Sequence, residues 1–266
     1  MSDSDAGQTV AGQPDDYGPW TYGDRIAEVY DEWTDQMDPA PVAAFLAEHL
    51  REGGRALELG IGTGRIALPL SRLGVDVEGI DASRAMVAKL RAKEGGDSIS
   101  VTIGDFADMA VEGVFSLVYV PFTTFFGLPS QREQLRCLVN VGAHLEAGGH
   151  FVLDAFVPDP TRFAGHQSVR FQGFAGNGVR LDVARHDPVD QLIESAHVVL
   201  GEDGIRIYPV QLRYAWPAEL DAMALASGLE HVARYRDYTK APFGPDSPSH
   251  VSVYRRPPAD DWEEDR

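Results

Sequence analysis

The sequence predicts an α/β protein with a doubly wound, mostly parallel sheet, a reversed last strand and an inserted antiparallel β meander. From residue 41 to 156, short apolar runs of strand length alternate with stretches of helical periodicity. Between residues 179 and 214 the period becomes two, which is typical of antiparallel strands. The last two apolar runs, 229–237 and 249–255, are joined by a loop too irregular for a crossover helix, so the final strand should be reversed.

A glycine-rich turn follows the first predicted strand. Residues 55–59 form a short apolar run, glycines occupy positions 60, 62 and 64, and apolar residues then return at helical spacing. Such a turn lets a ligand approach the backbone closely and offers free amides at the helix start. A dinucleotide fingerprint would need a third glycine where this chain has Arg65, so the turn favours another nucleoside ligand.

Two acidic residues end the next predicted strands. Asp81 follows the run 75–80, where a carboxylate can accept hydrogen bonds from both ribose hydroxyls. Asp105 and Phe106 follow the run 99–103. Each aspartate alone is also an ordinary turn former or helix cap. Together with the glycine turn, their order predicts a nucleoside site at the carboxyl edge of the sheet.

This order resembles the class I S-adenosylmethionine (SAM)-dependent methyltransferases of small-molecule type, and among them the glycine/sarcosine and amino-sugar N-methyltransferases. The resemblance covers residues 20–156 and implies SAM as the cofactor, with Asp105 accepting the adenine amino group and Phe106 flanking the ring. One departure is Gly127, where amino-sugar enzymes can carry a histidine. The SAM-contacting residues that the resemblance implies are Tyr30, Glu58, Gly60, Ile61, Gly62, Arg65, Asp81, Ala82, Met86, Asp105, Phe106 and Val120.

Two aromatic segments provide candidates for binding the methyl acceptor. One is an N-terminal helix that, by resemblance, folds over the SAM pocket, and the other is the loop after the fourth strand. Both segments could equally be plain core. The predicted acceptor-binding residues are Tyr22, Trp33, Phe122, Thr123, Thr124, Phe125 and Phe126.

The sequence identifies no catalytic residue. Asp154, His166 and His186 are the candidates for a general base, and none has a supporting pattern. No cluster of histidines and carboxylates predicts a metal site, and the single cysteine, Cys137, excludes a disulfide framework.

Charge and composition restrict the partners. The formal net charge is -18, to which the two ends of the chain contribute, and an acidic body repels phosphate backbones. We therefore expect a small-molecule acceptor and no nucleic acid. No apolar run is long enough to span a membrane, and no signal pattern is present, so we expect a cytoplasmic protein without a membrane partner.

The predicted organisation is one core interrupted by an insertion. The segments are a disordered tail at 1–18, a SAM-binding core with an N-terminal helical lid at 19–156, an antiparallel insertion at 157–215, the rest of the core at 216–256, and an acidic tail at 257–266. The exposed meander could pair with a second copy into a homodimer.

Three functions from different classes remain open. The first is SAM-dependent methyl transfer to a nitrogen or oxygen of a small metabolite. The second is a SAM-binding, methyltransferase-like protein that does not methylate, such as a cyclase. The third is a nicotinamide oxidoreductase, which shares the glycine turn and the acidic ribose residue.

Overall fold

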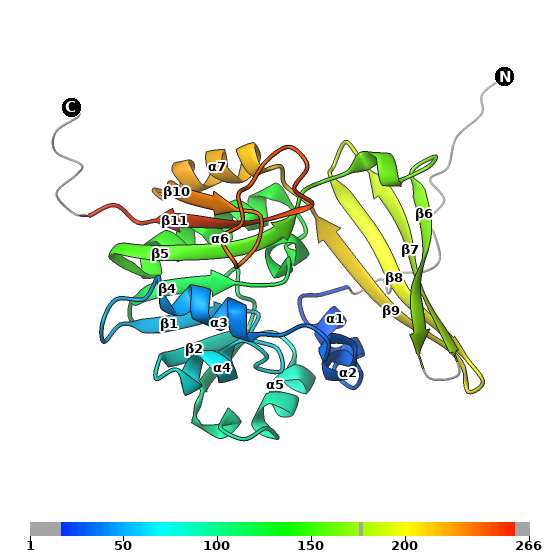
Figure 1. The fold of residues 1–266 in the computed structure, drawn as a ribbon, viewed down its shortest axis with the longest axis horizontal. Helices are drawn as coiled ribbons and strands as arrows, with labels where there is room; N and C mark the ends of the chain where they lie inside the picture. Colours follow the sequence, from blue (N-terminus) through cyan, green and yellow to red (C-terminus); the bar gives the residue numbers. More distant parts are fainter. Residues whose placement is uncertain (1–16, 176–177, 259–266) are drawn as a thin grey trace.

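The computed structural model describes residues 17–175 and 178–258, which form two sheets side by side (Figure 1). The larger sheet has the strand order β10-β11-β5-β4-β1-β2-β3. Its strands are β1 (Arg55–Leu59), β2 (Asp76–Asp81), β3 (Ser100–Ile103), β4 (Phe115–Val120), β5 (Leu145–Phe156), β10 (Glu230–Tyr235) and β11 (Ser249–Arg255). β1 to β5 pair in parallel, whereas β11 is antiparallel to both of its neighbours. The predicted parallel sheet with a reversed last strand is confirmed.

Helices cover both faces of this sheet. On one face, α6 (Gln131–His144) and α7 (Pro217–Ala226) pack against Leu57 and Val118. On the other, α3 (Ala40–Ala47), α4 (Ala67–Arg72) and the end of α5 (Arg84–Arg91) pack against Ala56 and Tyr119. Neighbouring residues of one strand thus enter opposite cores, as the two-residue period of a strand requires. The doubly wound arrangement follows from strands that are apolar on both faces.

The sequence predicts the fifth strand at residues 151–153, but β5 begins at Leu145. The sequence suggests a helix that continues to Gly148, but α6 ends at His144 and Gly148 and Gly149 lie inside the strand. A Cβ at Gly149 would meet three carbonyl oxygens, those of Phe115, Ser116 and Glu146, at 3.0–3.2 Å. Glycine therefore permits a close approach of strands here rather than ending the helix.

The insertion is a four-stranded antiparallel sheet in the order β6-β7-β8-β9. Its strands are β6 (Gln167–Ala175), β7 (Gly178–Asp187), β8 (Leu192–Gly201) and β9 (Gly204–Arg213). The predicted meander is confirmed, and β6 adds a strand that the sequence does not reveal. In the sequence the two-residue period slips by one at Pro209, which predicts a bulge there. That prediction is wrong, because the β8–β9 register runs unbroken past Ala196 and Pro209. The apparent change of phase arises because β9 carries apolar residues on both faces, and a register shift occurs instead in β6, between Phe171 and Gly173.

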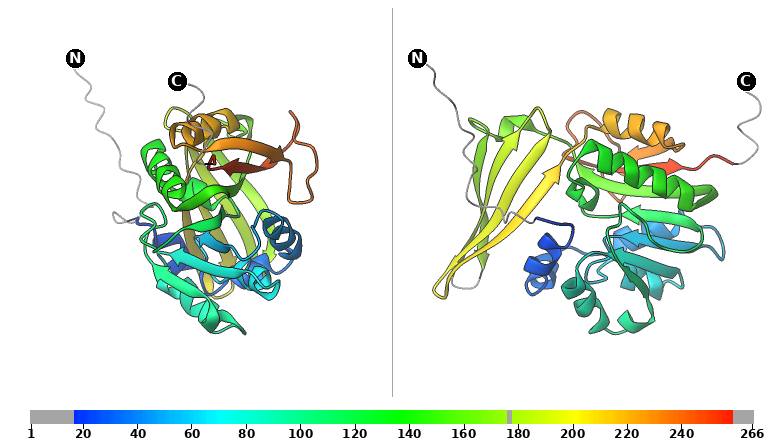
Figure 2. Two further views of the ribbon diagram at one scale, coloured as in Figure 1. Left: turned by 90° about the vertical axis from the view of Figure 1, so that its left-hand side faces the viewer. Right: turned by 180° about the vertical axis from the view of Figure 1, so that it is seen from behind.

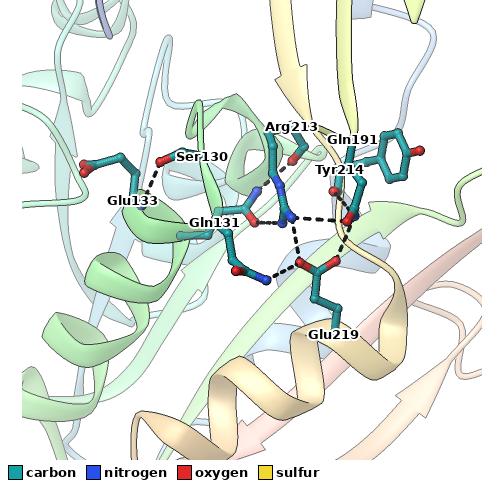
Figure 3. A network of polar contacts seen from close by, with 8 residues as sticks. Ser130, Gln131, Glu133, Gln191, Arg213, Tyr214 and Glu219 are labelled. Atoms are coloured by element: carbon teal, nitrogen blue, oxygen red, sulfur yellow. Dashed lines mark hydrogen bonds and ion pairs between the residues drawn. The ribbon is translucent and has the colours of Figure 1, made fainter. Parts of the chain in front are cut away.

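A buried polar network joins the insertion to the core (Figure 3). Arg213 at the end of β9 forms an ion pair of 2.7 Å with Glu219 of α7, and both side chains are largely buried. Gln134 of α6 donates to the Arg213 carbonyl at 2.7 Å and accepts from its guanidinium at 2.8 Å. Gln191 donates to Glu219 at 2.8 Å. Because every charge in the network has a partner, the network fixes the orientation of the four-stranded sheet on the core.

The N-terminal segment lies between the two sheets (Figures 1 and 2). It forms α1 (Thr21–Ile26) and α2 (Tyr30–Thr34) rather than one continuous helix. Asp24 of α1 accepts a hydrogen bond of 2.6 Å from Ser83 of the core, and the Tyr17 hydroxyl accepts one of 3.2 Å from the Gln211 amide of the insertion. Tyr17 therefore packs although it falls in the predicted tail; residues 1–16 and 259–266 of the two predicted tails lie outside the described residues.

Candidate active site

A cavity of about 570 Å³ lies between the carboxyl ends of the core strands, the N-terminal segment and the inner face of the insertion. The core contributes the glycine turn and the residues that follow β2, β3 and β4. The insertion contributes alternate residues of β7 and β8 and the consecutive residues 210–212 of β9. In open α/β sheets, ligands bind at this carboxyl edge.

The glycine turn after β1 is held against the end of β2. The Gly62 amide donates to Asp81 Oδ2 at 2.7 Å, and the Ser83 amide donates to Asp81 Oδ1 at 2.7 Å. Gly60 has a φ of 71°, and a Cβ there would meet Thr124 Cγ2 at 2.7 Å. The turn thus needs glycine both for its conformation and for its close approach to the loop after β4.

Asp81 keeps hydrogen-bonding capacity toward the cavity. Each of its carboxylate oxygens accepts one backbone amide, and each has a further lone pair. Burial raises the pKa of Asp81, and the two amides oppose that rise. A buried carboxylate held in this way can accept a pair of hydroxyl groups.

Glu58 forms a second, deeper carboxyl group at the cavity. It is 2% exposed and accepts a hydrogen bond of 3.0 Å from the Tyr119 hydroxyl. Burial, together with the nearby charge of Asp81, raises the pKa of Glu58 to about 8, against the effect of the Tyr119 hydrogen bond. Glu58 is therefore neutral at pH 7, which avoids two adjacent buried negative charges.

Arg65 presents a cation at the same end of the cavity. Its Nη2 donates to the Met37 carbonyl at 2.7 Å, and its guanidinium carbon lies 4.1 Å from the centre of the Phe122 ring. Its Nη1 is buried and has no hydrogen-bond partner within residues 17–175 and 178–258. An unpaired buried guanidinium nitrogen is costly, so it favours an anionic ligand group.

The loop after β4 is strained and fastened by Asp154. Phe122 and Thr123 have positive φ values of 58° and 62°, a conformation that costs non-glycine residues free energy and clusters at functional sites. Asp154 Oδ1 accepts from the Phe122 amide at 2.8 Å and from the Tyr238 hydroxyl at 2.5 Å. Burial raises the pKa of Asp154 to about 6. Asp154 does not line the cavity, so it holds the loop in place rather than acting as the general base that the sequence suggested as one candidate.

The two histidines considered as bases also lie elsewhere. Neither His166 nor His186 lines the cavity. His186 is buried, with Nε2 3.0 Å from the Tyr214 hydroxyl and its ring stacked on Phe163. Its role within the described structure is packing.

Most of the predicted site residues meet at this cavity. Those of the cofactor set that line it are Tyr30, Glu58, Gly60, Ile61, Gly62, Arg65, Asp81, Ala82, Met86, Asp105 and Phe106. Those of the acceptor set that line it are Tyr22, Phe122, Thr123 and Thr124.

Four predicted residues lie outside the lining. Val120, Phe125 and Phe126 are completely buried in the core beneath α6, because strand alternation and the short helix η2 (Thr124–Gly127) direct them away from the cavity. Trp33 packs edge-on against Tyr208, with ring centres 5.1 Å apart. It therefore joins α2 to the insertion.

The insertion wall was missed by sequence reasoning. Asp182, Ser195 and His197 line the cavity alongside apolar residues such as Val210 and Leu212. The alternation along residues 179–184 is visible in the sequence, but it does not tell which face is covered. Here the face bearing Asp182 is turned inward.

The residues present fit SAM. Its carboxylate suits the unpaired Arg65 Nη1, its ribose hydroxyls suit Asp81, and the bare backbone of Gly60 leaves room for close approach. The described residues hold no group of three His, Cys, Asp or Glu side chains arranged to bind a metal ion. Nor does any of the described helices have the length and hydropathy to cross a membrane.

Comparisons with known proteins agree with this geometry. Residues 56–149 match the family model described as a methyltransferase domain. The cypemycin N-terminal methyltransferase of Streptomyces sp. is 29% identical over 241 residues, which are 90% of this chain and 98% of that relative. The fold is also that of the sugar N-methyltransferase KedS8 from Streptoalloteichus sp. ATCC 53650, with a TM-score of 0.63 and 23% identity over 93% of this chain and 99% of the other.

A solved structure, that of the CcbJ methyltransferase from Streptomyces caelestis, resembles this chain over nearly its whole length. It is 39% identical to this chain, covers 91% of this chain and 100% of its own, and superposes with a TM-score of 0.85. These similarities confirm SAM as the cofactor. The chain belongs to the class I SAM-dependent methyltransferases and is an enzyme of that family.

Proposed function

We propose that the enzyme methylates an amine nitrogen of a small organic acceptor. The observation that carries this proposal is one continuous cavity that joins the glycine turn of the core to an insertion wall bearing Asp182 and His197. A largely buried carboxylate in this wall suits a cationic acceptor. The name of the Streptomyces relative, an N-terminal methyltransferase, also points to an amine.

The core residues would hold the cofactor in the roles that the resemblance implies. Asp81 would accept the ribose hydroxyls, Asp105 the adenine amino group, and Arg65 would bind the carboxylate. Phe106 would flank the adenine ring. When bound, SAM supplies an electrophilic methyl group on a sulfonium that is already a good leaving group.

The protein's own contribution is orientation and exclusion of water. The Asp154 hydrogen bond to the Phe122 amide fixes the loop after β4 against Gly60, which defines the space for an approaching nitrogen. The N-terminal segment closes the cavity on one side: Asp31 accepts a hydrogen bond of 2.6 Å from Thr63 and pairs with Lys93 at 2.8 Å. Both features favour a desolvated, aligned attack.

The acidic charge supports the expected partners. A net charge of -18 opposes binding of nucleic acid, so a free small molecule remains the proposed acceptor. The cytoplasmic location stays a prediction. So does the division of the chain at residues 18, 156, 215 and 256, which the separation of the two sheets supports.

We also propose a homodimer formed through the outer face of the insertion. Strand register places one side chain from each strand on this face, for example Phe171, Leu181, Val198 and Ile207. Phe171 and Ile207 are 59% and 56% exposed. An apolar sheet face of this extent favours a self-complementary contact with a second copy.

Sedimentation analysis tests the dimer. We expect a dimer for the native protein and a monomer for Phe171→Glu with Ile207→Glu, with SAM binding retained. Glu202→Lys in the β8–β9 turn serves as a surface control. A monomeric native protein at tens of micromolar would remove the proposal.

The proposed function is tested by product formation. The enzyme is incubated with SAM and a panel of small primary and secondary amines, and with matched alcohols. We expect S-adenosylhomocysteine to be released in equal amounts with a methylated amine. Release with alcohols only would contradict the amine assignment, and turnover of an acceptor without net release of S-adenosylhomocysteine would favour the non-methylating alternative.

A further inference from the structure

Asp182 and His197 form a polar pair in the insertion wall. They lie directly opposite each other on β7 and β8, and both line the cavity. The distance from Asp182 Oδ1 to His197 Nδ1 is 3.6 Å, and Asp182 is only 9% exposed. No other ion pair of Asp182 occurs within the described part of the chain. The carboxylate is thus confined but still open to a ligand in the cavity.

The surroundings leave this pair as the best placed proton acceptor. Tyr208 lies opposite His197 on β9, and Arg180 of β7 stacks on Trp33, with its guanidinium carbon 4.7 Å from the ring centre. Burial lowers the pKa of His197; Asp182 opposes that shift, and Arg180 adds to it. The imidazole is therefore neutral at pH 7 and carries a free lone pair.

The other titratable groups of the cavity are less suited. Burial raises the pKa values of Tyr22 and Tyr30, so both hydroxyls stay protonated. Glu58 holds its proton at pH 7, and Asp81 lies beside the glycine turn, where its free lone pairs are assigned to the ribose hydroxyls of the cofactor. Asp105 and Glu133 also line the cavity, but both pair with Arg136 of α6. We therefore place the base that faces the acceptor in the insertion wall.

We propose that Asp182 and His197 are the acceptor-amine site of the enzyme. Asp182 holds the acceptor as its ammonium ion, and His197 takes one proton from that nitrogen. The freed nitrogen lone pair then forms the new bond to the methyl carbon while the carbon–sulfur bond breaks, and S-adenosylhomocysteine leaves. The proton on His197 passes to water. This inference rests on the proposed amine methylation and adds the residues that perform it.

The kinetic test compares Asp182→Asn and His197→Gln with Glu202→Gln, a variant of an exposed residue in the β8–β9 turn that does not line the cavity. The probes are the amines that the native enzyme methylates best among the panel. We expect Asp182→Asn to raise KM for the amine by about tenfold or more. We expect His197→Gln to lower kcat about 100-fold and to remove the acidic limb of the pH profile of kcat/KM. Glu202→Gln should change neither constant by more than about twofold.

A binding test does not depend on turnover. The protein is saturated with S-adenosylhomocysteine, each amine of the panel is added in turn, and the ring signals of His197 are followed by NMR. We expect a shift in the native protein and none in Asp182→Asn. If no amine moves these signals, or if both variants keep native kinetics, the pair is not the acceptor site. Loss of SAM affinity in the variants would likewise overturn it, whereas a native enzyme that methylates only alcohols would refute the proposed function itself.

Discussion

The two walls of the cavity are built in different ways. The core wall comes from strand ends and turns, where Gly62, Asp81 and Ser83 are joined by backbone hydrogen bonds. The insertion wall comes from the middle of three strands, where side chains alternate between the two faces of the sheet. Turns fix backbone donors around one ligand, whereas a strand face can change side chains without changing its backbone. The comparison indicates a cofactor site fixed by backbone geometry, facing a proposed acceptor site that depends on side chains alone.

The largest effect on cofactor affinity is expected from the core wall. Asp81→Ala removes the acceptor of two backbone amides and the proposed ribose contact, so we expect SAM affinity to fall by at least about tenfold. Isothermal titration calorimetry measures the affinity for SAM. Asp76→Ala on the same strand, which is exposed, is the matched control. Native SAM affinity in Asp81→Ala would show that Asp81 does not bind the cofactor.

The second effect is a pH dependence of stability caused by Glu58. Its pKa rises from 4.5 to about 8 on folding, so between these values the folded protein holds a proton that the unfolded chain has lost. The contribution of Glu58 to the free energy of unfolding is fully present below pH 4.5, the pKa in the unfolded chain. It is lost as the pH rises toward 8, at about 1 kcal/mol per pH unit. Denaturant unfolding at pH 6, 7 and 8 measures the slope. Glu58→Gln should flatten it, and an equal slope in both proteins would contradict the assignment.

The third effect concerns the loop that separates the two walls. Tyr238→Phe removes the hydroxyl that donates to Asp154, so we expect a loss of about 1–3 kcal/mol in the free energy of unfolding. Tyr235→Phe is the control, since its hydroxyl makes no hydrogen bond among residues 17–175 and 178–258. Chemical denaturation gives both values. Equal stability of the two variants would show that Asp154 does not depend on this donor.

The smallest effect is expected on SAM affinity when a residue of the insertion wall is changed. Val210→Ala shortens a side chain that lines the cavity on β9. We expect SAM affinity to stay within about twofold of the native value, while KM for the amine changes. A large loss of SAM affinity would mean that the two walls do not divide their ligands as proposed.

Sequence reasoning recovered the core wall because its signals are local. The glycine turn, Asp81 and Asp105 each follow directly from the end of a strand, and parallel strands bring such ends together. The reversed last strand was recognised from the irregular loop before β11.

The insertion wall could not be predicted in the same way. Asp182 and His197 meet only through the β7–β8 register, and the face they occupy is decided by how the sheet docks on the core. That docking depends on buried pairs such as Arg213 with Glu219, which no local pattern marks. Phe125 and Phe126 looked like pocket residues because they follow a strand end, but the short helix η2 directs them into the core.

The division of labour between the walls is tested most directly by titrating S-adenosylhomocysteine into three proteins in parallel. These are the native enzyme, Asp81→Ala and Asp182→Asn. We predict a loss of at least about tenfold in affinity for Asp81→Ala and native affinity for Asp182→Asn. Equal losses in both variants, or native affinity in Asp81→Ala, would contradict the account.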